Sequence, residues 1–258
     1  MRWSIAMKLI DNLNITENDV ITITGGGGKT SLMFALSKEL ATRKLNHVMT
    51  TTAKICIADV PEQQCLICDN MTEVIEAIAK DPQREWLIGK ERVNGQKISG
   101  FSEAELITLK GSIVPLVIIN EGDGSKRKPY KFYLDYEPSI PPITTKLIHV
   151  MGAEILFRII DEETFHRSEL YNNELSNSEL SDNDQAIFDE DVLLQTLKAF
   201  IDNKLNNALA KTATRILFIN KADGDNLTNA RIMAKIGAPL FDHCLLGSLQ
   251  EGWLEQIK

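Results

Sequence analysis

Cysteine, long apolar runs and an excess of positive charge are all scarce in this sequence. The four cysteines among 258 residues are too few for a disulfide scaffold, so we expect them to be reduced. Cys65 and Cys68 have metal-ligand spacing, but no second pair accompanies them, which favours buried strand residues over a metal site. No apolar run approaches the ~20 residues that span a bilayer. Because Lys8 and Asp11 interrupt the apolar residues near the N-terminus, a signal peptide is not expected, and the sequence predicts a cytoplasmic protein without a membrane partner.

The charge balance argues against nucleic acid as a partner. The chain has 28 basic and 36 acidic residues and a net charge of −8, whereas proteins that bind nucleic acid carry a basic footprint. We therefore expect a small ligand. A chain of 258 residues with 43% apolar residues can bury a substantial core, which predicts one domain over residues 1–258. The polar, acidic segment 168–185 is expected to be a mobile, solvated loop or helix-loop of that domain.

A run of four glycines stands where a strand pattern changes to a helix pattern. The run and the residues after it are Gly25, Gly26, Gly27, Gly28, Lys29, Thr30 and Ser31. Glycine allows the chain to approach an anion closely, and the free amides at a helix start attract phosphate. The sequence therefore predicts a phosphate-binding loop, in which Lys29 contacts the β- and γ-phosphates and the Thr30 hydroxyl ligates Mg²⁺.

The loop is shorter than the commonest P-loop pattern. That pattern has a first glycine five residues before Gly28, where this chain has Ile23. A deviant form of the pattern has a signature lysine directly before the glycine pair, where this chain has Thr24. The compact form Gly-x-x-Gly-Lys-Thr is satisfied from Gly25 to Thr30. This compact form is similar to the loop of Mur-type ligases.

Apolar runs separated by helical patterns continue along the chain. Strands are expected at 20–24, 47–51, 64–68, 86–88, 115–120, 146–151, 215–219 and 244–246, and helices from residue 32 and at 72–80 and 102–109. The nearly continuous apolar run 115–120 is typical of a central parallel strand, so we place it beside the strand of the glycine loop. This alternation predicts an α/β, P-loop NTPase-like fold, with a mostly parallel sheet and helices on both faces.

Two acids, Glu121 and Asp123, follow the expected strand 115–120. A carboxylate at the end of a strand beside a phosphate loop can hold Mg²⁺ or act on the attacking group, and the residues leave open which acid does which. The alternative is a turn, since Asp-Gly is common in turns. Lys54, which follows Thr50, Thr51 and Thr52 at another strand end, is a further candidate for positioning the nucleophile.

The segment 125–131, SKRKPYK, places four cations close to these acids in an otherwise acidic chain. A charge run is usually a solvated turn. Its position directly after an expected active-site strand equally favours contact with an anion, either the triphosphate or an acidic substrate.

Another strand pattern ends in Asn220, Lys221 and Asp223, read as NKAD. The Asp223 carboxylate could accept from both N1–H and the N2 amino group of guanine, while Asn220 contacts the base edge and the Lys221 stem covers its face. Adenine lacks this pair of donors. The pattern therefore favours GTP over ATP, and a polar turn without a ligand is the alternative.

Together and in this order, the motifs resemble those of the YqeC family, described as accessory proteins of selenium-dependent molybdenum hydroxylases. The matching segments are GGGGKTS at 25–31, TTTAK at 50–54, EGDGSKRKP at 121–129, EPSIPP at 137–142, HR at 166–167 and NKAD at 220–223. The family usually has Ala where this chain has Gly122. The resemblance implies a cytosolic protein that acts in maturation or insertion of a molybdenum cofactor, with the hydroxylase or its cofactor as partner, but it implies no particular reaction.

The residues themselves predict Mg²⁺-dependent binding of a nucleoside triphosphate, ATP or GTP, and its hydrolysis. Lys29 would neutralise the phosphates, Thr30 and one acid would hold the metal, and the other acid or Lys54 would position the nucleophile. One alternative is a small ATP-dependent kinase, nucleotidyltransferase or Mur-like ligase. Another is a nucleotide-gated binding protein without turnover.

Overall fold

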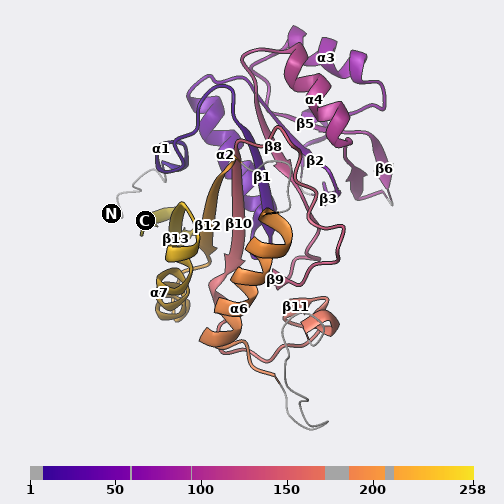
Figure 1. Cartoon of the computed structure of the whole chain (residues 1–258). Coiled ribbons are helices and arrows are strands. Elements are labelled where there is room, and N and C mark those ends of the chain that lie inside the picture. Colours follow the sequence, from indigo (N-terminus) through magenta and orange to yellow (C-terminus); the bar gives the residue numbers. More distant parts are fainter. Residues whose placement is uncertain (1–7, 59, 94, 172–185, 207–211) are drawn as a thin grey trace.

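The computed structural model of the chain describes residues 8–58, 60–93, 95–171, 186–206 and 212–258. A nine-stranded sheet runs through its centre in the order β14-β13-β12-β10-β1-β8-β2-β5-β4 (Figure 1). All neighbouring strands of this sheet are parallel except β13 and β14. The expected α/β fold with a mostly parallel sheet is therefore confirmed.

The large sheet contains β1 (Val20–Gly25), β2 (His47–Thr51), β4 (Cys65–Ile67), β5 (Trp86–Gly89), β8 (Val117–Glu121), β10 (Lys146–Gly152), β12 (Thr214–Asn220), β13 (His243–Ser248) and β14 (Trp253–Gln256). The α-helices are α1 (Leu9–Asn12), α2 (Lys29–Thr42), α3 (Met71–Lys80), α4 (Glu103–Ser112), α6 (Glu190–Phe200) and α7 (Asn226–Gly237). A separate antiparallel sheet contains β3 (Lys54–Cys56), β7 (Lys97–Ser99) and β6 (Glu91–Val93), and β9 (Tyr130–Lys131) pairs with β11 (Phe165–His166). Short helical turns are η1 (Glu62–Gln64), η2 (Ala153–Ile155), η3 (Ser168–Leu170), η4 (Ile201–Leu205) and η5 (Ala238–Leu240).

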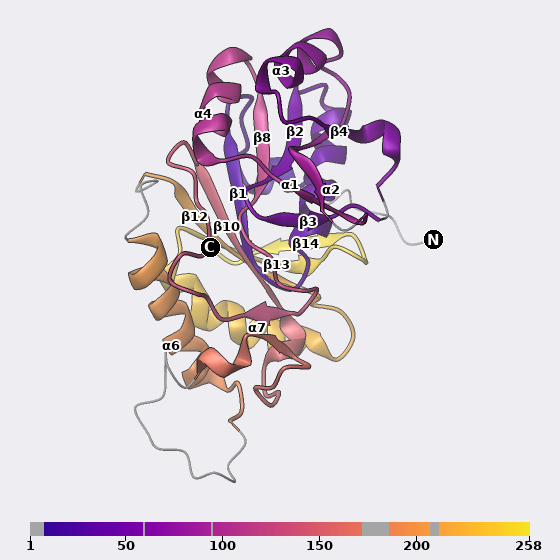
Figure 2. The ribbon, with the colours of Figure 1, turned by 90° about the vertical axis from the view of Figure 1, so that its right-hand side faces the viewer.

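Helices cover both faces of the large sheet, as predicted (Figures 1 and 2). Successive residues of a strand point to opposite faces. Ile21 and Ile23 of β1 therefore pack with the residues of α1 and α2 on one face, whereas Val20 packs with those of α3 and α4 on the other. The second half of that other face, over β10, β12 and β13, is covered by α6 and α7. Two apolar layers thus enclose the sheet.

The glycine loop leaves the sheet at its centre. β1 lies between β8 and β10, which confirms the predicted neighbour of the first strand. The chain places β2, β4 and β5 beyond β8, and then crosses β1 to place β10, β12 and β13 on the other side. Such a reversal of strand order opens a crevice outside the carboxyl ends of the strands, which is where open α/β sheets bind their ligands.

The predicted elements differ from the structure mainly in what they leave out. Each predicted strand and helix has an observed counterpart, and Ser102 caps α4 in a capping box with Glu105. The three-stranded sheet was not predicted, because strands of three residues are too short to show a period. Of the polar segment 168–185, only the start through η3 to residue 171 is described, so the expected loop at 172–185 lies outside the described residues. None of the helices in the described ranges is long and apolar enough to cross a membrane.

A buried histidine lies behind the glycine loop. His149 is on β10, its Nδ1 is 3.1 Å from Thr24 Oγ1, and its ring stacks on Phe200 with centroids 3.9 Å apart. Its Nε2 has no hydrogen-bond partner among the described residues. Burial lowers the pKa of His149 to about 3, so the ring is neutral at neutral pH.

We expect His149 to make the fold less stable in acid. In the unfolded chain the ring has an ordinary pKa of 6.5, whereas the folded chain protonates it only near its pKa of about 3. The stability that comes from the neutral ring is therefore present above pH 6.5 and lost as the pH falls toward 3. Between about pH 6 and pH 4, the free energy of unfolding of the parent protein should fall by about 1.4 kcal/mol per pH unit more than that of His149→Gln. Urea unfolding at several pH values measures both slopes, and equal slopes would contradict the assignment.

Candidate functional site

Each glycine of the loop is packed so closely that a side chain would clash. A Cβ atom at any of the four positions would lie closer than 3.0 Å to another segment: Val150 for Gly25, Lys128 and Pro129 for Gly26, Gly152 for Gly27, and Asn220 for Gly28. Gly25, Gly27 and Gly28 also have positive φ, which favours glycine. The loop is thus held by β10, by the basic segment and by the end of β12.

The amides of the loop divide into two groups. Those of Gly25, Gly26 and Gly27 donate to Asp123 Oδ2 at 3.0 Å, Val150 O at 2.9 Å and Lys128 O at 3.0 Å. The next four amides, from residue 28 to residue 31, donate to no group among the described residues, and the first bond of α2 runs from Leu32 N to the carbonyl of residue 28. The first group fixes the loop, and the second points from a helix start in the manner of an anion site.

The Lys29 ammonium lies buried between the ends of β1 and β8. Its Nζ donates to Gly25 O at 2.7 Å and lies 3.0 Å from Asp123 Oδ1 and 3.8 Å from Glu121 Oε1. The side chain of Lys29 is only 2% exposed. The structure therefore brings together the lysine and both acids that the sequence singled out.

The two acids have different surroundings. Burial raises the pKa of Glu121, against the opposing effect of Lys29 and of the Thr30 hydroxyl. Burial alone would also raise the pKa of Asp123, but Lys29, Lys131 and the Gly25 amide lower it below its ordinary value. The opposite directions of the two pKa shifts make Asp123 the stronger acid of the pair, in contact with the lysine, and Glu121 the weaker one.

Thr30 and Glu121 are placed to share a cation. The Thr30 hydroxyl donates to Glu121 Oε2 at 2.8 Å, so both oxygens can reach one ion. No group of three or more His, Cys, Asp or Glu side chains that could hold a metal occurs in the parts of the chain that the structure describes. Mg²⁺ commonly takes one or two protein oxygens and completes its shell with phosphate oxygens and water. The residues present fit a magnesium ion of that kind.

Of the three residues expected to read the base, Asn220 contacts the glycine loop. Asn220 Nδ2 donates to Gly27 O at 2.7 Å, and Asn220 Oδ1 accepts from Leu249 N at 3.1 Å. This side chain therefore braces the loop against the turn after β13. Asp223 accepts from Ser248 Oγ at 2.7 Å and remains partly exposed. Lys221 is in an ion pair with Glu154.

Ser248 and Leu249 are site residues that the sequence analysis missed. The apolar run 244–246 could have indicated them, because it predicts a parallel strand. The carboxyl end of such a strand lies at the same edge of the sheet as the other strand ends. Their hydrogen bonds to Asp223 and Asn220 join the end of β13 to the end of β12, and these contacts form only in the folded chain.

Among the described residues, the Lys54 side chain forms no hydrogen bond or ion pair with Lys29 or the two acids, whereas Thr51 bonds to the backbone of Glu121. The three hydroxyls of residues 50–52 donate to backbone carbonyls, namely those of Ile88, Glu121 and Ser139. Lys54 is exposed at the start of β3 and forms no ion pair with a described residue. Its expected part in positioning the nucleophile stays a prediction.

The basic segment 125–131 has a buried end. The Lys131 side chain is 0% exposed, and its Nζ donates to Gly124 O and to Glu137 Oε2, both at 2.8 Å. Arg167 pairs with the same Glu137 carboxylate. This network holds the last residue of the segment against the residue that precedes its start, while two cations in the middle of the segment remain exposed.

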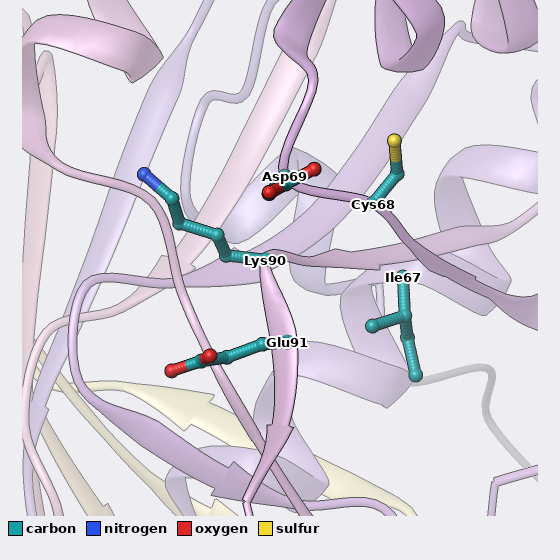
Figure 3. A pocket seen from close by; sticks show the side chains of 5 residues that line it. All are labelled: Ile67, Cys68, Asp69, Lys90 and Glu91. Carbon is teal, nitrogen blue, oxygen red and sulfur yellow. The ribbon is translucent and has the colours of Figure 1, made fainter.

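A pocket of about 430 Å³ opens at the ends of β4 and β5, which β8 and β2 separate from β1. It is lined by Ile67, Cys68, Asp69, Lys90 and Glu91, and Figure 3 shows the last two side chains extending to the same side. Lys90 is already paired with Glu105 at 2.8 Å. We do not include this pocket in the candidate site.

Known proteins are similar to this chain over part of its length. A family model described as "YqeC protein" matches residues 21–169. An "Uncharacterized protein YqeC" from Escherichia coli (strain K12) is 30% identical over 148 residues, which is 57% of this chain and 57% of the relative. The chain thus matches little more than half the length of that relative. The family match includes the glycine loop, both acids and the basic segment, whereas Asn220 and Asp223 lie beyond it.

Gly25→Ala should destabilise the fold, because its Cβ would meet the Val150 backbone at a residue whose φ is +96°. We expect the free energy of unfolding to fall by roughly 2–4 kcal/mol. Gly111→Ala is the matched control, since a Cβ there would meet nothing within 4 Å, and alanine in a helix should add roughly 0.5–1 kcal/mol. Denaturant unfolding measures both variants, and a neutral Gly25→Ala would contradict the described packing.

Proposed function

The chain belongs to the YqeC family, and from that premise we propose that it binds and hydrolyses a Mg²⁺-bound nucleoside triphosphate as an accessory factor in molybdenum-enzyme maturation. The arrangement around Lys29 carries the proposal. A buried ammonium, four amides without described acceptors and a hydroxyl–carboxylate pair converge at the centre of the sheet. These are the groups that a triphosphate and its metal require.

The geometry supports a division of work between the two acids. Glu121, within 2.8 Å of the Thr30 hydroxyl, is suited to hold Mg²⁺, which when bound would neutralise charge on the phosphates. Asp123, bonded to the Gly25 amide and close to Lys29, is suited to hold the loop and to aim the ammonium. In this arrangement Lys29 leaves Asp123 in part to neutralise the β- and γ-phosphates.

Guanine is the base that the strand ends favour. Asp223 is partly exposed, and Ser248 orients its carboxylate by a 2.7 Å hydrogen bond, which leaves acceptor capacity for the paired donors of guanine. Asn220 supports the base site indirectly, because its amide already joins Gly27 to Leu249. We therefore propose GTP as the preferred nucleotide, with ATP as the alternative.

Lys29→Ala should weaken nucleotide affinity at least ~100-fold, because the phosphates lose their charged donor. Isothermal titration with Mg²⁺ and GTP or ATP measures affinity, and release of inorganic phosphate measures turnover. Unchanged affinity would overturn the proposal, whereas binding without phosphate release would leave a nucleotide-gated binding protein.

Since Lys29→Ala also leaves Asp123 buried without its cation, the variant can fail to fold. Thr30→Val then carries the test, because it keeps the shape but removes the metal-binding hydroxyl. We expect it to lose the part of the affinity that depends on Mg²⁺. Thr42→Val, at the exposed end of the same helix, is the control and should keep that dependence.

Asp223→Asn should shift base preference from guanine toward xanthine, because an amide can donate to the carbonyl that xanthine has in place of the guanine amino group. We expect GTP affinity to fall at least ~10-fold and xanthosine triphosphate affinity to rise. Asp225→Asn, an exposed acid two positions later, should change neither. Equal affinity of the parent protein for GTP and ATP would remove the claim of base recognition.

A further inference from the structure

Three exposed cations from separate parts of the chain lie on or beside the small three-stranded sheet. Lys54 begins β3, Lys97 begins β7, and Arg127 lies in the loop after β8. All three side chains are exposed. We call these three residues the basic face.

The three-stranded sheet turns two of these cations to the same side. Ile55 and Ile98 are opposite each other in β3 and β7, and both are buried against the core. Because side chains alternate along a strand, the residues that flank them point away from the core. Lys54 and Lys97 are such flanking residues, one on each strand.

Arg127 reaches the same side from the neighbouring loop. Its Nη2 lies 3.8 Å from Sγ of Cys56, and Cys56 pairs directly with Lys97. The guanidinium therefore lies over the open side of the small sheet. It brings a planar set of donors to the side of the sheet from which Lys54 and Lys97 extend.

None of the three members of the basic face forms an ion pair with a described residue. Glu91, opposite Ser99 on the outermost strand, is the acid that the register places on the same side. In a chain of net charge −8, neighbouring cations that repel each other without a partner indicate an anionic ligand.

One member of the basic face, Arg127, is the sequence neighbour of a residue that contacts the glycine loop. Arg127 precedes Lys128, whose carbonyl accepts from Gly27 N at 3.0 Å. Lys131, through its bond to Gly124 O, holds the other end of this short connection. An anion on the basic face would therefore be a neighbour of the triphosphate.

We propose that the basic face binds the phosphate group of a small second substrate beside the nucleotide. An arginine fork with two ammonium groups suits a phosphate, which offers oxygens on several sides. Three cations are too few for the extended footprint of a nucleic acid. The inference rests on the proposed function only in taking the ligand beside the basic face to be the triphosphate. Phosphate binding itself can be tested without nucleotide.

Inorganic phosphate is the probe, and the side-chain N–H signals of ¹⁵N-labelled arginine are the readout. The full chain is titrated first without nucleotide and then with Mg²⁺ and a non-hydrolysable GTP analogue. The signal that Arg127→Gln removes should shift in a saturable manner in both states. Lys97→Gln should weaken this binding at least ~5-fold. Lys38→Gln, an exposed lysine of α2 without an ion pair among the described residues, is the matched control and should not.

The outcomes separate the possible sources of the anion. No saturable shift, or an equal loss in Lys38→Gln, would overturn the site. A shift that disappears once the nucleotide analogue binds would show that the basic face holds the nucleotide's own phosphate. Displacement of phosphate by a short RNA at lower concentration would show a nucleic-acid surface. Either result would overturn the proposal. If the analogue does not bind but the phosphate shift remains, the proposed function fails and the phosphate site stands.

Discussion

The burial of one ammonium group, that of Lys29, is the constraint on which the rest of the site depends. Removing an ion from water costs several kcal/mol unless other groups replace the water. Asp123 and the carbonyl of Gly25 provide that replacement, and they come from the ends of β8 and β1. These two strands must therefore lie side by side, and α2 must begin at Lys29, before the charge can be buried at all.

The same constraint explains why the glycine loop is so tightly enclosed. The loop cannot carry side chains because β10, the basic segment and Asn220 already lie against it. Its first three amides hold this position, and the next four have no acceptor among the described residues. Contacts that fix the loop thus also connect it to the end of β12, through Asn220, and to the basic face, through the Lys128 carbonyl. One packed loop links all three regions.

The large sheet could be predicted because its strands are long apolar runs with clear boundaries. β8 and β10 show this best, since nearly every residue in them is buried. The three-stranded sheet could not be predicted in this way, because a strand of three residues shows no period. This sheet is held by Ile55 and Ile98, which pack on the core. For this reason Lys54 was expected only at the end of the preceding strand, whereas it begins a strand of its own, β3.

The sequence by itself determined the chemistry that is available: a glycine run before Lys29 and Thr30, acids after the central strand, and Asp223 after a later one. These follow from local pattern, because a residue's place at a strand end is set by the apolar run before it. Only the tertiary structure decided which of these groups contact one another. That Glu121 meets Thr30 while Asp123 meets Lys29, and that Ser248 orients Asp223, depends on strand order and register. Contacts between residues about 90 apart in the chain, such as Thr30 and Glu121, exist only once the sheet has assembled, so no local pattern can specify them.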